Sequence, residues 1–477
     1  MARSDRYGML VRVFLLLLPW ALFSTAADAA QFDGAQLGLA WGVPFVGILL
    51  SIAFMPLFAP AFWHHHYGKI SVACALAFLA PFTYFFGVTA AMHQVAHVLL
   101  LEYLPFIIVL FALYTIAGGI RVHGNLHGAP GSNTALLAFG TFMASWIGTT
   151  GAAMLLIRPL IRANDNRKHN AHVVVFFIFL VANAGGALTP LGDPPLFLGF
   201  LMGVDFFWTT IHMFLPTVLL CTLLLSMFFV VDWYYFSYRD EQKPPRLDPT
   251  PDSPIRIEGG INLALLVFVI GAVLLSGFWR PGIAFELLGS RLELQSITRD
   301  VLLLVIALLS LRLTPRSARH GNDFKWAPMM EVAKLFIGIF LTIIPVIAIL
   351  RSGTDGALGS LIRIATDANG QPINAMYFWL TGSLSAFLDN APTYMVFFNM
   401  AGGDPKVLSG PLATTLMAIS AGAVYMGAMT YIGNAPNFMV KAIAEHNGIR
   451  MPSFFGYMAW SIAFLLPCLI LIAWIFF

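Results

Sequence analysis

Two aspartates lie inside otherwise apolar segments, at points where glycine and proline interrupt the helical pattern. Asp193 lies in Thr-Pro-Leu-Gly-Asp-Pro-Pro (189–195), and Asp389 begins Asp-Asn-Ala-Pro (389–392). A charge at membrane depth is costly, so an acid placed there usually faces a cavity and marks the path of an ion or a proton. Loss of water favours the protonated acid, whereas a bound cation favours the carboxylate, so proton and cation compete for one group. This competition is the minimal chemistry of an antiporter.

Hydroxyl and amide side chains cluster in the same interruptions. Hydroxyls, amides and freed backbone carbonyls are the hard oxygen ligands that a small cation such as sodium requires, and helix C-terminal ends add partial negative charge. Besides the two aspartates, the candidate ligands for sodium and the proton are Thr149, Thr150, Thr189, Asn390, Thr430 and Asn434, with Asn183, Glu102, Thr393 and Asn437 as secondary candidates. Asn and Thr also cap broken helix ends, and this alternative is strongest for Asn183, Thr393 and Asn437. Glu102, within an apolar run, is either a second proton site or an interfacial or paired side chain.

The pattern around Asp193 occurs twice. Residues 430–436 read Thr-Tyr-Ile-Gly-Asn-Ala-Pro, which repeats residues 189–195 at an offset of 241 positions. At the same offset, Ala-Ser-Trp-Ile-Gly-Thr (144–149) corresponds to Ser-Ala-Phe-Leu-Asp-Asn (385–390). Two blocks in one register indicate an internal duplication, and paired helix interruptions in two halves are the best sequence indication of a transporter's substrate site. The alternative is two accidental proline kinks in packed helices.

Composition places the chain in a membrane. Of its 477 residues 59% are hydrophobic and only 10% are charged, and the mean hydropathy is +0.81. A net charge of +3 is too small to suggest a nucleic-acid partner. Cys74, Cys221 and Cys468 lie in apolar runs without a CxxC spacing, so they predict neither disulfides nor a metal site. Because no Ser-His, metal-ligand or phosphate-binding constellation is found in the apolar runs, we do not expect an enzyme or a cofactor.

The first 30 residues have the layout of a secretory signal peptide. Arg3, Arg6 and Arg12 precede the short apolar run 13–23, and Ala27-Asp-Ala29 supplies a small-x-small cleavage site. Cleavage would place the mature N-terminus outside the inner membrane. The alternative is an uncleaved first helix.

Ten apolar runs are expected to cross the bilayer, and two further segments enter and leave on one face. The expected spans are 36–59, 70–91, 98–120, 171–203, 207–231, 259–279, 300–314 (short, with uncertain ends), 327–350, 412–443 and 453–477. Residues 133–163 and 375–402 are broken in the middle and are expected to form re-entrant helical hairpins. The predicted fold is therefore an all-α polytopic membrane protein with two repeats, 31–235 and 259–477, each of five spans and one hairpin. A cytoplasmic linker, 236–258, joins the repeats.

Charge orients these segments. With the mature N-terminus outside, 17 Lys and Arg residues after the signal peptide fall on the cytoplasmic face, and six fall on the outer face. The six are Arg280, Arg291, Arg299, Arg351, Arg363 and Lys406. An odd number of spans per repeat inverts the second repeat, so the two hairpins open to opposite sides and the C-terminus lies outside. The run His64-His65-His66 near Lys69 is either a metal patch or, more commonly, a solvated interfacial face.

The runs Asn-Ala-Gly-Gly-Ala-Leu-Thr-Pro-Leu-Gly-Asp (183–193) and Phe-Leu-Asp-Asn-Ala-Pro-Thr (387–393) resemble the NhaD-type sodium/proton antiporters of the ion transporter superfamily, and through it the citrate and arsenite permeases. The resemblance implies an inverted repeat, two re-entrant hairpins, a scaffold part that often forms a homodimer, and a transport part that moves against it. It also implies a cation-site role for Asp193, Asp389, Asn390 and the flanking Thr residues. Two departures stand out: the Pro194-Pro195 pair, and the absence of the Ser-Asn-Thr hairpin signature typical of dicarboxylate carriers.

The resulting hypothesis is a secondary antiporter that exchanges sodium or a similar cation for protons in the bilayer of the inner membrane. A site with two carboxylates and no central Arg or Lys suits a cation better than a multivalent anion. The alternative is a cation-coupled symporter of citrate or another organic anion. On the sequence alone, Asp389→Asn is expected to abolish transport, and Asp193→Asn is expected to be severe but less so, because Asn434 occupies the equivalent position.

Overall fold

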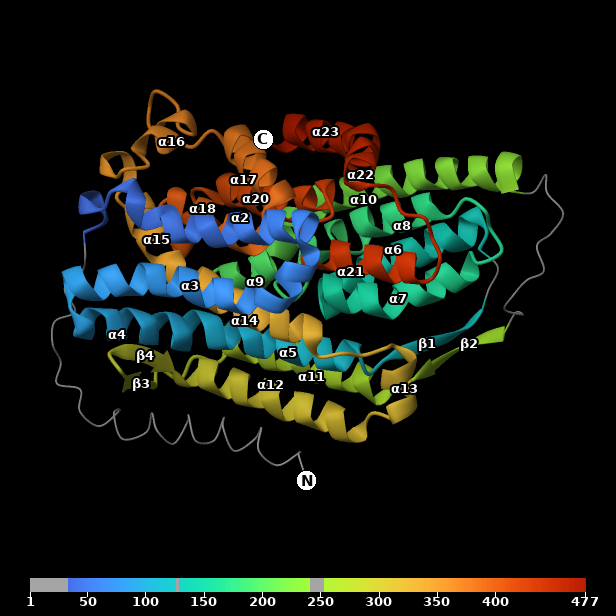
Figure 1. The fold of residues 1–477 in the computed structure, drawn as a ribbon, viewed down its shortest axis with the longest axis horizontal. Helices are drawn as coiled ribbons and strands as arrows, with labels where there is room; N and C mark the ends of the chain where they lie inside the picture. The colour runs from blue at the N-terminus through green and yellow to red at the C-terminus, as the bar shows by residue number, and fades with distance from the viewer. Residues whose placement is uncertain (1–32, 126–127, 241–252) are drawn as a thin grey trace.

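The computed structural model describes residues 33–125, 128–240 and 253–477. The expected signal peptide, 1–30, lies outside the described residues, as does most of the expected linker. The described chain is predominantly helical (Figure 1). Eight of its helical segments are long and apolar enough to cross a membrane, and a ninth is obtained when the bent pair α14–α15 is taken as one span. The protein is therefore an all-α polytopic membrane protein.

The helices of the first half follow the order of the expected spans. They are α2 (Val43–Phe58), α3 (Pro60–Phe86), α4 (Val88–His97), α5 (Leu104–Ala117), α6 (Pro130–Ile147), α7 (Thr149–Ala163), α8 (Ala171–Leu180), α9 (Pro194–Leu201) and α10 (Phe206–Tyr234). A π-helical turn, η4 (Val98–Tyr103), joins α4 to α5, and the short η5 (Ala184–Leu188) lies between α8 and α9. Lipid cannot hydrogen-bond to the backbone, so the apolar runs satisfy their own amides as helices.

The second half repeats this order. Its helices are α11 (Ile261–Phe278), α12 (Leu294–Leu313), α13 (Arg316–Gly321), α14 (Ala327–Thr342), α15 (Ile344–Arg351), α16 (Gly359–Ile364), α17 (Asn374–Phe387), α18 (Asn390–Met400), α19 (Pro405–Ser409), α20 (Ala413–Met426), α21 (Ala435–His446), α22 (Phe454–Trp460) and α23 (Leu466–Phe476). The span expected at 300–314 is a full 20-residue helix. The segment expected at 412–443 is not one continuous span, because an apolar helix ends at Met429 and α21 begins only at Ala435.

Two small antiparallel sheets were not expected from the sequence. β1 (Arg121–Asn125) pairs with β2 (Ser253–Glu258), and β3 (Ala284–Leu287) forms a hairpin with β4 (Ser290–Glu293). β2 is the end of the expected linker, and an ion pair of 3.2 Å between Arg121 and Glu258 fixes it to the first half. The end of this linker is therefore ordered against β1.

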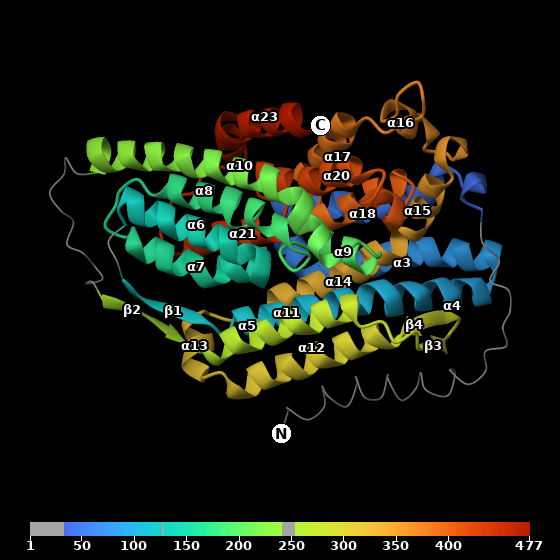
Figure 2. The same ribbon diagram turned by 180° about the vertical axis from the view of Figure 1, so that it is seen from behind.

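The hairpin expected in each half is present in the described chain. α6 packs on α7, with the break at Gly148 (φ +81°), and α17 packs on α18, with the break at Leu388 and Asp389. The two hairpins lie in opposite halves of the elongated molecule, α6–α7 toward the β1–β2 end and α17–α18 toward the α16 end (Figures 1 and 2). The second helix of each hairpin packs on the broken helix of the other half, α7 on α21 and α18 on α9. The two halves are thus interlocked at their breaks.

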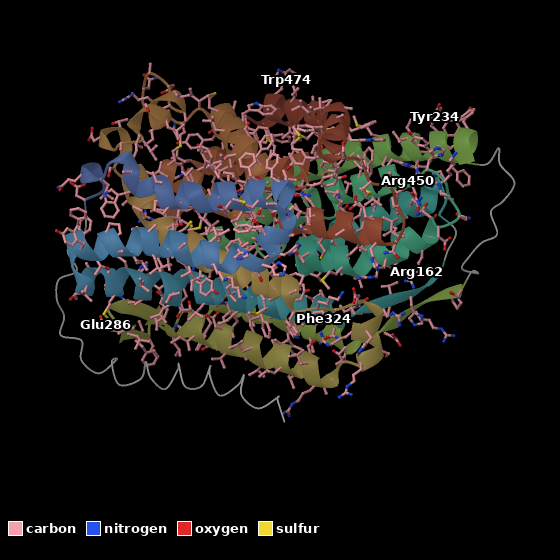
Figure 3. The ribbon with its side chains drawn as sticks, viewed as in Figure 1. Arg162, Tyr234, Glu286, Phe324, Arg450 and Trp474 are labelled. Carbon is pink, nitrogen blue, oxygen red and sulfur yellow. The ribbon has the colours of Figure 1, made fainter. Side chains whose placement is uncertain are left out.

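Positive side chains are found at the β1–β2 end. Arg162 and Arg450, both expected on the cytoplasmic side, lie in that half of the molecule, whereas Glu286 lies at the opposite end (Figure 3). This placement is the one that the charge pattern predicts. The direction of the molecule in a membrane, and with it the position of both termini, stays a prediction.

Candidate functional site

The two helix breaks have the same hydrogen bonds. The hydroxyl of Thr189 donates to the carbonyl of Ser145, and the hydroxyl of Thr430 donates to the carbonyl of Ala386, the equivalent residue of the second hairpin. Each hydroxyl also accepts from a backbone amide two residues later, at 3.2 Å in both halves. The two threonines of the repeated motif therefore attach each broken segment to the hairpin of its own half, which is a positioning role.

Glycines allow both breaks to close. A Cβ atom on Gly192 would lie 2.2 Å from the carbonyl oxygen of Gly186, and one on Gly433 would lie 2.5 Å from that of Gly427. Real Cβ contacts are never this short, so only glycine permits these two backbone approaches. The glycine before Asp193 or Asn434 in the repeated motif is thus required by packing.

Asp193 lies at the centre of the interlocked breaks, with 2% of its surface exposed. One carboxylate oxygen accepts from the Thr149 hydroxyl at 3.0 Å and from the Asn434 amide at 3.3 Å, and the other accepts from the Asn390 amide. These four residues lie at the starts of α7, α9, α18 and α21. Since the N-terminal end of a helix carries partial positive charge, four such ends stabilise the buried carboxylate.

A chain of amides extends from this centre. Asn434 also donates to Asn183 Oδ1 at 3.2 Å, and Asn183 donates to Asn437 Oδ1 at 2.7 Å. Asn437 in turn donates to the carbonyls of Gly427 and Thr430. Asn183 and Asn437 are not equivalent by the repeat, so the repeated motif does not predict their contact. Asn437 therefore holds backbone carbonyls of the broken segment, and its role in cation binding stays a prediction.

One acceptor in the centre lacks a partner. Asn390 is fully buried, and its Oδ1 makes no hydrogen bond within the described part of the chain, although its Nδ2 donates to Asp193. A buried oxygen without a donor is costly. Located beside a carboxylate, it is an oxygen ligand available to a cation.

The other expected site residues lie outside this hydrogen-bonded centre. Asp389 caps α18 by accepting from the amide of Ala391 at 3.0 Å, and Thr393 donates to the Asp389 carbonyl. Glu102 lies on η4, where its Oε2 is buried and has no partner among the described residues. Thr150 lines a cavity next to Asp193. Among the described residues, no group of three His, Cys, Asp or Glu side chains is arranged to hold a metal, and the rings of His65 and His66 bond to carbonyls one turn earlier.

A cavity of about 110 Å³ reaches Asp193 from one side. Its polar wall consists of Thr149, Thr150 and Asp193, and the remaining wall is mostly apolar. The opposite side is formed by α5 near Tyr114 and by the start of α14 near Met329. The cavity therefore separates these two helices from the tip of the first hairpin, at Gly148 and Thr149. It has room for several water molecules.

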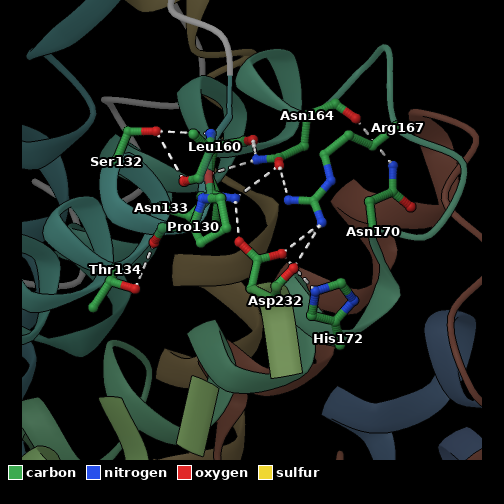
Figure 4. Close-up of polar contacts among 11 residues, drawn as sticks. Pro130, Ser132, Asn133, Thr134, Leu160, Asn164, Arg167, Asn170, His172 and Asp232 are labelled. Carbon is green, nitrogen blue, oxygen red and sulfur yellow. Dashed lines mark hydrogen bonds and ion pairs between the residues drawn. The ribbon is translucent and has the colours of Figure 1, made fainter. Parts of the chain in front are cut away.

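The structure also shows a buried ionic cluster that the sequence analysis did not identify (Figure 4). Asp232, fully buried near the end of α10, binds Arg167 at 2.7 Å, His172 at 2.8 Å and Asn133 at 2.9 Å. Asn164 completes the cluster through Asn133 and Arg167. These residues connect the base of the first hairpin to α8 and α10. In the sequence, Asp232 is a single acid in the last turns of an apolar run. Such an acid, taken alone, resembles a charge at the membrane interface.

Replacing Asp232 with alanine should destabilise the protein by about 3–5 kcal/mol, because the Arg167 guanidinium would stay buried without its carboxylate. Thermal unfolding of the purified protein in detergent measures this loss. Lys325→Ala is the control, since the ion pair of Lys325 with Asp323 is exposed on both sides and should contribute little. Equal melting temperatures for the two variants would show that the cluster does not hold the hairpin base.

Two interlocked halves, each with a helical hairpin and a broken helix around one buried carboxylate, define the architecture of a secondary transporter. Residues 34–477 match a protein-family model described as "Putative citrate transport", so the chain belongs to this transporter family. A search of curated proteins finds no match to the chain.

Proposed function

We propose that the protein is a secondary antiporter that exchanges sodium, or a similar small cation, for protons, with Asp193 as the shared binding group. The buried carboxylate at the end of a cavity that can hold several water molecules, surrounded by hydroxyl and amide groups, carries this proposal. The described cavity wall contains one acid and no Lys or Arg. Such a wall favours a cation over an anion.

Cation binding requires a change at the donors. In the described state the hydroxyl and both amides donate to Asp193, which suits a carboxylate without a bound cation. Rotation of the Asn390 amide would turn its free Oδ1 toward the carboxylate, and rotation of the Thr149 hydroxyl would present a lone pair. A proton on Asp193 would remove the charge that the cation needs. The two ligands therefore exclude each other at this group.

We propose that Asp193 is accessible alternately from the cytoplasmic side and from the outer side of the membrane. Under the orientation predicted from charge, the cavity between α5, α14 and the α7 tip leads from Asp193 to the cytoplasm. Movement of the interlocked hairpins and broken helices against α5 and α14 would close this cavity and open the other side. Such movement of one part against another is the usual basis of alternating access.

The second candidate is cation-coupled uptake of citrate or another organic anion. The family description favours it, and so does the tip of the first hairpin. Asp389 caps α18, but Gly148 at the equivalent position leaves α7 without a side-chain cap, beside the cavity. A substrate carboxylate could occupy at α7 the place that the Asp389 carboxylate occupies at α18. In this case Asp193 would hold the coupling cation.

Transport by the purified protein in proteoliposomes separates the two candidates. For an antiporter, adding sodium should dissipate an imposed pH gradient without citrate, and citrate should leave the rate unchanged. For a symporter, labelled citrate should accumulate only with a cation or proton gradient. The Asp193→Asn protein in the same liposomes is the control for leakage. Citrate accumulation without sodium–proton exchange would replace the first candidate by the second.

A further inference from the structure

A second cavity, of about 300 Å³, lies at the opposite end of the molecule from β1–β2. Its walls come from η4, from the turn between α9 and α10, and from the β3–β4 hairpin with the adjoining ends of α11 and α12. Figure 2 shows β3–β4 beside α4 at this end. None of the residues expected to bind the transported ions lines this cavity. It is therefore separate from the Asp193 site.

Three arginines line this cavity: Arg280, Arg291 and Arg299. Arg299 is 3% exposed and binds Asp300 through Nε at 2.8 Å. Arg280 bonds to the carbonyl of Gly277, and neither Arg280 nor Arg291 forms an ion pair in the described part of the chain. Planar guanidinium groups with free donors match the oxygen atoms of a phosphate group. The arginines thus provide an oxyanion site.

The same cavity offers acceptors to a cationic group. Asp205, Glu293 and Asp300 also line it, so the charges of arginines and acids balance. Gln295, 7% exposed, donates from Nε2 to Glu293 at 2.6 Å, which fixes the amide with Oε1 as its acceptor. This Oε1 is buried and has no partner among the described residues. A ligand that satisfies it must carry an N–H or O–H donor.

The cavity lies at a level where lipid headgroups are expected. α11 ends at Phe278 and α12 begins at Leu294, and Phe278, Trp279, Ile283 and Phe285 around this turn are exposed. Trp279 is of the residue type that is enriched at the membrane–water interface. One part of the cavity wall is apolar and contains Leu100, Leu101, Phe200 and Leu201. A ligand with a polar head and a hydrocarbon tail fits both parts.

We propose that this cavity binds a zwitterionic phospholipid with a primary ammonium group, of the phosphatidylethanolamine class. The phosphate binds the three arginines, the ammonium donates to Gln295 Oε1 and the neighbouring acids, and an acyl chain follows the apolar wall between η4 and α9. A glycerol headgroup has hydroxyl donors for Gln295 but no cation for the acids. A choline headgroup lacks the N–H donors.

Native mass spectrometry of the full chain in detergent, after addition of defined lipids, tests this site. The protein should retain phosphatidylethanolamine at least about tenfold better than phosphatidylcholine, which corresponds to one charge-assisted hydrogen bond. Combined Arg280→Gln and Arg291→Gln substitutions should lower retention of phosphatidylethanolamine by a similar factor. Both residues are exposed, so the variant is expected to fold. Arg363→Gln, an exposed arginine on α16 outside the cavity, is the matched control and should retain the lipid as the wild type does.

Equal retention of phosphatidylethanolamine and phosphatidylcholine would overturn the assigned headgroup. Preferential retention of phosphatidylglycerol would likewise overturn it. Unchanged lipid retention in the double arginine variant, with the melting temperature of the wild type, would remove the phosphate site. All three readouts are independent of transport.

Discussion

Replacing Asp193 with asparagine is expected to reduce cation-coupled transport by at least about a hundredfold, while the protein still folds and inserts. Asparagine conserves the volume but removes the only charge in the hydrogen-bonded centre, so it binds neither a titrating proton nor a cation with comparable strength. Initial rates in proteoliposomes at matched protein content measure the effect, and size-exclusion profiles and melting temperatures report the fold.

Folding of this variant is expected because the centre can adapt. The new amide would place a donor against the donor of Asn390, but Asn390 has an unpartnered Oδ1 and can turn it inward. Asp389→Asn is the matched control. Asparagine caps a helix as well as aspartate does, so the N-terminus of α18 should remain capped and most of the transport should be retained.

We thus expect Asp193→Asn to impair transport more than Asp389→Asn does. The sequence alone suggests the reverse order of severity. Asp389 and Asp193 both lie at a helix break, and the equivalence of Asp193 with Asn434 suggests that an amide is tolerated at position 193. The geometry assigns Asp389 to a cap and brings Asn434 into contact with Asp193 itself. Loss of transport in Asp389→Asn with normal transport in Asp193→Asn would restore the sequence-based expectation.

The apparent affinity for sodium should strengthen as pH rises. A proton on Asp193 removes the charge that binds the cation, so deprotonation vacates the site. The apparent affinity is expected to increase by about tenfold per pH unit on the acidic side and to level off once the acid is fully deprotonated. The maximal exchange rate should fall at both extremes, because each side must be able to gain and lose the proton.

Measurement of sodium-driven exchange between about pH 5.5 and 9 covers the range expected for a buried acid. An affinity independent of pH over this range would exclude competition at one carboxylate. The symporter would then become the better explanation, with Asp193 holding a coupling cation and the tip of α7 holding an organic anion.

Much of the fold follows from the sequence because membrane insertion leaves few choices. Long apolar runs must be helices, and the motif Thr-x-(Leu/Ile)-Gly-(Asp/Asn)-x-Pro places glycine and proline where a helix cannot continue. The structure shows why each position has this residue. The threonine bonds to the hairpin, the glycine permits the close backbone contact, and the Asp or Asn enters the centre.

Other features depend on contacts that a sequence pattern does not contain. Asn183 and Asn437 are 254 positions apart and meet only because α9 and α21 cross to the opposite hairpins. The Asp232 cluster combines α6, α8 and α10 with the turn after α7, and no single residue in it has a distinctive spacing. The pairing of β1 with β2 joins the end of the linker to a strand more than a hundred residues earlier.

Proton release on sodium binding reports competition at Asp193 without any transport step. Purified protein in weakly buffered detergent solution is mixed with sodium chloride, with choline chloride as the ionic-strength control, and the pH change is recorded. The wild type should release about one proton per bound sodium on the acidic side of the titration, because both ligands use Asp193. Asp193→Asn should release none. Full proton release by Asp193→Asn, or saturable sodium binding to the wild type without release, would show that sodium and the proton do not compete at Asp193.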